Sequence, residues 1–129
     1  MIDLCVEKIK TQFSSDEWPQ FVSVQEQENG CGLTIDVNQN VRWFEGHFPG
    51  QPVLAGVVQT HWAAELGKFI FSIEEDFQRI DNLKFQNVIM PPLTIVLKLE
   101  FLSEKNALKF KFYDDDCTYS EGKIVFAVE

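Results

Sequence analysis

Apolar and polar residues alternate along the second half of the chain, which is the pattern of strands that bury one face. The alternation is regular in residues 94–102 and 107–113, where Leu or Phe recurs between charged residues. Residues 80–89 and 118–128 are also rich in apolar side chains, and polar or proline-containing turns separate the four stretches. We expect them to form antiparallel meander strands with one face turned inward.

The first third of the chain predicts a short helix and then a hairpin. Apolar residues spaced by three or four positions indicate a helix within residues 1–18. Residues 21–27 and 31–37 have the alternation of strands, and Asn29-Gly30 between them is a hairpin-turn signal. We therefore expect two paired strands before the middle of the chain.

A long apolar stretch without proline, residues 57–73, lies between the hairpin and the four later strands. Its apolar side chains recur every three or four positions and also fill several positions between, which predicts a helix buried nearly all round. Seventeen residues make a helix of roughly 25 Å. The expected fold class is α+β, with an antiparallel β-sheet wrapped around a long central helix. We expect residues 1–129 to form a single domain.

The loop before this helix has an unusual composition. Residues 46–56 hold three glycines, two prolines and one histidine, and they run into the helix without a polar linker. Proline restricts the backbone while glycine permits rare dihedrals, so this composition favours a loop of fixed shape.

The charge of the chain limits its partners. A net charge of −9 argues against nucleic acid, whose phosphates require a basic face. An acyl carrier protein, which is usually acidic, would need a local cluster of basic residues. The candidates near the glycine- and proline-rich loop are Arg42, Lys68, Arg79 and Lys84.

Cysteine usage and the N-terminus indicate an intracellular protein. The three cysteines have no paired spacing and no histidine cluster beside them, so neither a zinc site nor a disulfide framework is expected. No basic and then apolar leader opens the chain, and no apolar run reaches the length of a membrane span. We expect a cytoplasmic location, with no metal and no cofactor.

The loop and helix start carry a specific motif. Gly46-His47-Phe48-Pro49 is followed by Pro52-Val53 and then by Gly56-Val57. This order resembles the active-site motif of the hotdog-fold 3-hydroxyacyl-acyl-carrier-protein dehydratases, and the continuation is similar to the aryl-polyene biosynthesis branch. The resemblance implies dehydration of a 3-hydroxyacyl thioester on acyl carrier protein, in fatty-acid or aryl-polyene type biosynthesis. It also implies a trans-2-enoyl product, no cofactor, and a homodimer with its site at the interface.

Three residues are the expected catalytic groups. The resemblance gives His47 the role of the base that takes the proton alpha to the thioester carbonyl, a step suited to a neutral imidazole. It places the backbone N–H of Gly56, at the helix start, against the thioester oxygen. Free N–H groups at a helix N-terminus suit an enolate-like oxygen on physical grounds alone.

The acid that helps the hydroxyl leave is the third group, and it has two candidates. The better-known dehydratases carry Glu or Asp where this chain has His61, and an imidazolium there is also able to deliver the proton. Glu65 lies one turn further along the helix and either pairs with His61 or takes over the acid role. The sequence leaves both possibilities open.

Further residues are expected to bind substrate. The motif and its continuation give this role to Phe48, Pro49, Val57, Gln59 and Glu65, whereas Trp62 is expected in the core. Two other functions compete with dehydration: a hotdog thioesterase, and a non-catalytic acyl-binding or scaffold subunit. The replacement of the carboxylate by His61 favours the last.

Overall fold

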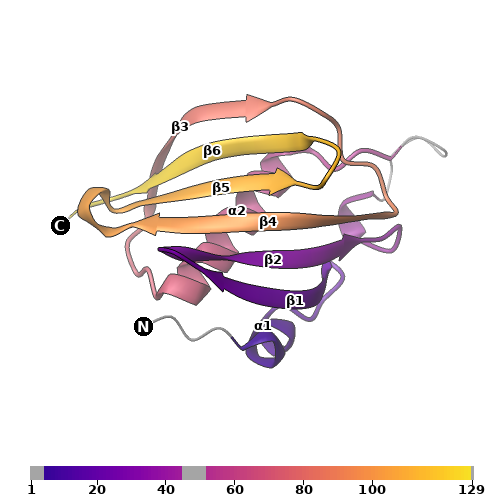
Figure 1. Ribbon diagram of the computed structural model, residues 1–129, viewed down its shortest axis with the longest axis horizontal. Helices are drawn as coiled ribbons and strands as arrows, with labels where there is room; N and C mark the ends of the chain where they lie inside the picture. Colours follow the sequence, from indigo (N-terminus) through magenta and orange to yellow (C-terminus); the bar gives the residue numbers. More distant parts are fainter. Residues whose placement is uncertain (1–4, 45–51, 129) are drawn as a thin grey trace.

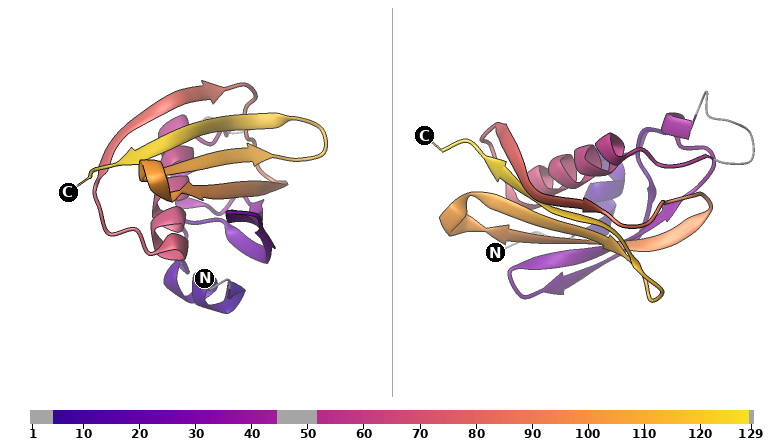
Figure 2. Two further views of the ribbon diagram at one scale, coloured as in Figure 1. Left: turned by 60° about the vertical axis from the view of Figure 1, so that its left-hand side comes forward. Right: turned by 90° about the horizontal axis from the view of Figure 1, so that it is seen from above.

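The chain forms one antiparallel sheet that curves around a single long helix (Figures 1 and 2). The structure is a computed structural model and describes residues 5–44 and 52–128. The elements are, in order, α1 (Val6–Gln12), β1 (Gln20–Gln27), β2 (Gly30–Val37), the 3-10 helix η1 (Arg42–Phe44), α2 (Gly56–Phe71), β3 (Phe77–Phe85), β4 (Leu93–Leu102), the 3-10 helix η2 (Ser103–Lys105), β5 (Ala107–Tyr113) and β6 (Thr118–Phe126). The predicted α+β class and the sheet around a helix are confirmed.

The order of the strands corrects one expectation. The sheet runs β1-β2-β4-β5-β6-β3, with every neighbouring pair antiparallel. Thus β4, β5 and β6 form the expected meander, but β3 pairs with β6 at the far edge and has no contact in the ladder with β4. The chain crosses the inner face of the sheet as α2 before it enters β3, so it reaches the edge opposite the hairpin (Figure 1).

Local sequence patterns predicted the other elements well. The hairpin turn falls where Asn29-Gly30 predicted it, and Asn29 adopts the positive φ of 63° that such a turn requires. The helix α2 ends two residues before the predicted end, because Ser72 turns into the left-handed region with φ 56°. Ile73, which continues the apolar pattern, instead donates its backbone N–H to the carbonyl of Lys68.

The central helix is buried on one side only, which corrects the expectation of burial nearly all round. Trp62, Ala63 and Leu66 are fully buried against the sheet. Val57, at the helix start, is 75% exposed, and His61 is also exposed. The sheet wraps the inner side of α2, and the opposite stripe is covered only in part, where Trp18 lies against His61.

The two edges of the sheet differ in their cover. The β1 edge is flanked by α1 (Figure 1), and Ile9 and Phe13 of this region are buried. The β3 edge leaves Phe77 and Phe85 more than half exposed. Within the described ranges, no helix is both long and apolar enough to cross a bilayer.

Candidate active site at the start of the central helix

Three of the predicted site residues, His47, Phe48 and Pro49, lie outside the described residues, and their roles stay predictions. The backbone on the helix side of them is held in place by two hydrogen bonds. The N–H of Leu54 donates to the carbonyl of Ile89 at 2.9 Å, and the Leu54 carbonyl accepts from the side-chain amide of Gln59 at 2.9 Å. These bonds fix the backbone just before α2 begins.

Gly56 is the first residue of α2 and combines two properties. Ala55 before it supplies no side-chain cap, and no acceptor for the backbone N–H of Gly56 or Val57 is present among the described residues. These free donors carry the partial positive charge of a helix N-terminus. A Cβ on Gly56 would lie 2.6 Å from the Phe85 ring, so any larger residue there would have to displace this ring of β3.

His61 lies on the exposed stripe of α2, one turn after Val57. Its ring stacks on the indole of Trp18, with the ring centroids 5.4 Å apart and an angle of 24° between the planes. Among the described residues His61 forms no ion pair with Glu65 or any other carboxylate. The structure therefore gives His61 an aromatic neighbour in place of the pairing that the sequence left open.

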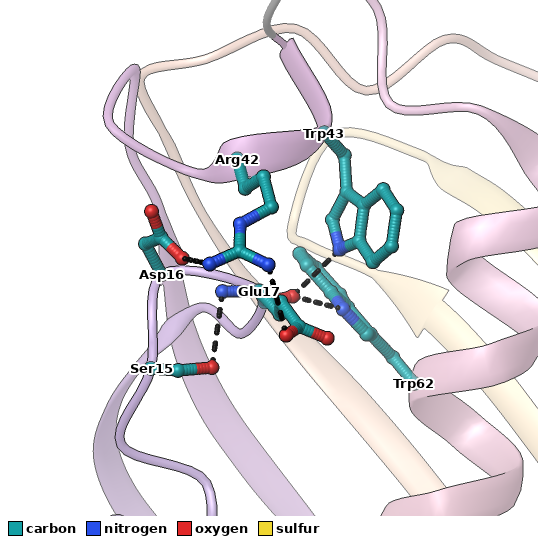
Figure 3. A network of polar contacts seen from close by, with 6 residues as sticks. All are labelled: Ser15, Asp16, Glu17, Arg42, Trp43 and Trp62. Atoms are coloured by element: carbon teal, nitrogen blue, oxygen red, sulfur yellow. Dashed lines mark hydrogen bonds and ion pairs between the residues drawn. The ribbon is translucent and has the colours of Figure 1, made fainter.

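The segment that carries Trp18 is anchored by a polar network, shown in Figure 3. The backbone carbonyl of Glu17 accepts hydrogen bonds from the indole nitrogens of Trp43 and Trp62, both at 2.8 Å. The Arg42 guanidinium binds the carboxylates of Asp16 at 3.0 Å and Glu17 at 3.2 Å. Trp62 is thus a core residue, as predicted, and its indole also ties the N-terminal segment to α2.

Gln59 faces the inside of the molecule, on the other side of α2 from His61. It is 3% exposed, and its two amide atoms are both satisfied within the protein. The nitrogen donates to the Leu54 carbonyl, and the oxygen accepts from the Ser120 hydroxyl on β6 at 2.6 Å. This contact fixes the start of α2 to the sheet, which is a positioning role.

The exposed stripe begins with the neighbouring residues Gly56 and Val57, and His61 and Glu65 follow at steps of about one turn. The structure therefore brings together the helix-start N–H groups and the candidate acid on one face. Sequence reasoning missed Trp18 and Phe85. No local pattern pointed to either residue, because each reaches α2 from a distant part of the chain.

The groups with shifted pKa values lie away from this stripe. Burial raises the pKa of the Cys31 thiol to about 12, which keeps this thiol protonated and unreactive. At the β5–β6 turn, the hydrogen bond from the Tyr119 hydroxyl lowers the pKa of Asp114, while burial and Asp114 raise the pKa of Tyr119. The described residues contain no group of three or more His, Cys, Asp or Glu side chains placed to hold a metal ion.

Comparison with known proteins places this chain in a family. Residues 23–123 match the ApeI-like family model, described as ApeI dehydratase. The chain belongs to the ApeI-like dehydratases.

One solved structure and one sequence relative agree with this membership, and a second solved structure shares the fold. The dehydratase heterocomplex ApeI:P from Xenorhabdus doucetiae superposes with a TM-score of 0.79 at 29% identity, covering 86% of this chain and 99% of that one. A 3-hydroxyacyl-[acyl-carrier-protein] dehydratase FabZ from Ruminiclostridium cellulolyticum is 31% identical over 103 residues, which are 72% of each chain. The dehydratase domain from the CurK module of curacin polyketide synthase shares the fold, with a TM-score of 0.62 at 14% identity over 88% of this chain and 44% of that one. The hotdog fold and the dehydratase resemblance predicted from the motif are confirmed.

Proposed function

We propose that this ApeI-like dehydratase removes water from a 3-hydroxyacyl thioester on acyl carrier protein and forms the trans-2-enoyl thioester. The observation that supports this proposal best is the exposed stripe of α2, where free N–H groups and the His61 imidazole share one face. The family supplies the reaction class. The proposed substrate agrees with the activity for which the FabZ relative is named.

In the proposed mechanism, neutral His47 takes a proton from the carbon next to the thioester carbonyl. The electron pair of that C–H bond moves toward the carbonyl, and the N–H of Gly56 donates to the oxygen where charge develops. Protonated His61 gives its proton to the hydroxyl on the neighbouring carbon as the C–O bond breaks. The double bond forms, water leaves, and the proton gained by His47 and the proton lost by His61 balance.

The proposed site also needs a second chain. The strand β3 has a partner on one side only, and its exposed side carries Phe77, Leu83 and Phe85. An exposed apolar edge strand is a surface on which another strand pairs. We propose that two copies of this chain join there, so that the loop with His47 of one copy faces His61 of the other. The Xenorhabdus relative is a heterocomplex, which makes a second, different chain the alternative occupant.

The decisive experiment follows the mass of a 3-hydroxyacyl chain on acyl carrier protein. Loss of one water is expected with the natural protein, no loss with His47→Ala, and a slower loss with His61→Ala. Release of the free acid would indicate a thioesterase. A bound thioester that neither loses water nor is hydrolysed would indicate an acyl-binding subunit. Both outcomes would overturn the proposed reaction. The cytoplasmic location stays a prediction.

A further inference from the structure

Six of the eleven basic residues lie on one surface, the outer face of the sheet. They line a shallow depression of about 570 Å³ together with Glu100 and Glu121. Lys98, Lys109 and Lys111 alternate with the buried Leu and Phe residues of β4 and β5, so their side chains point away from α2. This face is turned toward the viewer in Figure 1, with α2 behind the sheet. We call it the lysine face: Lys84, Lys98, Lys105, Lys109, Lys111 and Lys123.

The lysine face holds both like-charged and oppositely charged pairs across its strands. Lys98 lies directly opposite Lys111 on the neighbouring strand, and Lys109 lies directly opposite Lys123. Like charges in such pairs are destabilising. In the described part of the chain, none of the six ammonium groups has a carboxylate within 4.0 Å. Glu100 lies opposite Lys109 and Glu121 opposite Lys111, but six lysines against these two carboxylates leave the face basic in a chain with a net charge of −9.

Of the basic residues expected near the motif, two are engaged by carboxylates and one belongs to the lysine face. Arg42 is engaged by Asp16 and Glu17, and Arg79 is engaged by Asp81. Lys84 belongs to the lysine face and is followed by Phe85, whose ring packs against the start of α2. The lysine face therefore reaches the edge of the sheet that borders the candidate site.

We propose that the lysine face is the docking surface for an acidic carrier protein that delivers the acyl chain. This inference rests on the proposed function and adds the place where the partner binds. Charge complementarity supports a small acidic protein, because it would meet only this face. An anionic bilayer or a nucleic acid extends beyond the face and would meet the rest of the chain, which is more acidic than the whole. The face also presents no large exposed apolar side chain that would anchor it in a bilayer.

The test compares two double variants that change the net charge equally. Lys98→Gln with Lys111→Gln neutralises one opposed pair of the lysine face. Lys8→Gln with Lys10→Gln neutralises two exposed lysines of α1, outside it. We expect the first variant to bind apo acyl carrier protein about tenfold more weakly, and the second to bind within about twofold of the natural protein. Binding of the natural protein should weaken as salt rises from about 50 to 200 mM, because screening shortens the reach of the charges.

Thermal unfolding separates docking from folding. Removing the Lys98 and Lys111 charges abolishes one repulsive pair and the attractive pair of Lys111 with Glu121, so Tm should stay nearly unchanged. A loss of carrier binding together with a lowered Tm would contradict the proposal, because it would indicate a structural role. Equal carrier affinity for the two double variants would also contradict it. So would binding of vesicles of equal parts phosphatidylglycerol and phosphatidylcholine in preference to the carrier protein.

Turnover distinguishes failure of this inference from failure of the proposed function. With the lysine-face variant, KM for the carrier-bound substrate should rise about tenfold, while turnover of the same acyl chain on pantetheine stays unchanged. Equal turnover of the carrier-bound substrate by both variants would overturn the docking site alone. If neither substrate loses water, the proposed reaction is overturned. The docking site is then still tested by the binding of apo acyl carrier protein to the two double variants.

Discussion

The two edges of the sheet differ in how far the chain covers them. At the β1 edge the chain supplies its own cover, because α1 and the following segment pack there and the Glu17 carbonyl is held by two indole N–H groups. At the β3 edge the described chain supplies nothing, and Phe77, Leu83 and Phe85 are 55%, 40% and 51% exposed. Folding of one chain covers the β1 edge, whereas the uncovered β3 edge is the place of the association proposed above.

Exposed apolar residues alone do not make the distinction. Val22 on β1 is 51% exposed, about as much as Phe85, yet it is an isolated case beside a bulge in the pairing of β1 with β2. Single exposed hydrophobics are ordinary, whereas a contiguous group marks an interface. The difference between the two edges therefore rests on the grouping of exposed apolar residues along β3 and on the unpaired side of this strand.

The largest effect is expected when charge is placed on the β3 edge. Phe77→Asp combined with Leu83→Asp should separate the assembly into single chains and reduce dehydration about 100-fold or more, because two apolar anchors of an interface are lost. Sedimentation measures the assembly, and water loss from the carrier-bound substrate measures the activity.

The control places one added charge at the other edge. Val22→Asp changes a residue of similar exposure on β1 and should leave both assembly and activity intact. Equal disruption by the two changes would remove the distinction between the edges. A β3 variant that stays assembled and active would place the interface elsewhere.

A smaller effect is expected at the contact between β3 and α2. Gly56→Ala adds a Cβ at 2.6 Å from the Phe85 ring and should destabilise the fold by about 1–3 kcal/mol through overpacking. The displaced helix start should lower kcat about tenfold. This loss is smaller than the roughly 100-fold or greater loss that follows complete removal of such a donor. The added change Phe85→Leu should restore part of both losses. Full stability and activity of Gly56→Ala would show that the ring does not require the glycine.

The smallest effect is expected at the closed edge, where Trp18 stacks on His61. Trp18→Ala should lower kcat about two- to tenfold with KM unchanged, in keeping with the roughly 0.5–1.5 kcal/mol of an aromatic pair. Trp18→Phe should recover most of kcat. Trp43→Phe removes a hydrogen bond to the same segment without touching His61, and it should lower Tm but keep kcat. A loss of kcat in Trp43→Phe equal to that in Trp18→Ala would assign Trp18 a purely structural role.

The sequence predicted those parts of the fold that depend on neighbours along the chain. The hairpin at Asn29-Gly30 and the alternating strands β4 and β5 follow from local turn chemistry and period. The position of β3 could not be predicted in this way. Its composition resembles that of the other strands. It pairs with β6 because α2 carries the chain across the sheet to the edge formed by β6.

The candidate site shows the same division. The motif identified Gly56 and His61, and the structure places them on one face of α2. Trp18 and Phe85 approach that face from the N-terminal segment and from β3, and no spacing in the sequence links them to it. The burial of Gln59 against Ser120 was missed because it depends on a partner on β6.

The most direct test of a site shared between two chains is complementation. The variants His47→Ala and His61→Ala are co-expressed, purified as a mixture and assayed for water loss beside each variant alone. If each site takes His47 from one copy and His61 from the other, half of the randomly assembled dimers regain one intact site. The mixture should then show about a quarter of the natural activity. Activity no higher than the average of the two variants alone would contradict a site built from two chains.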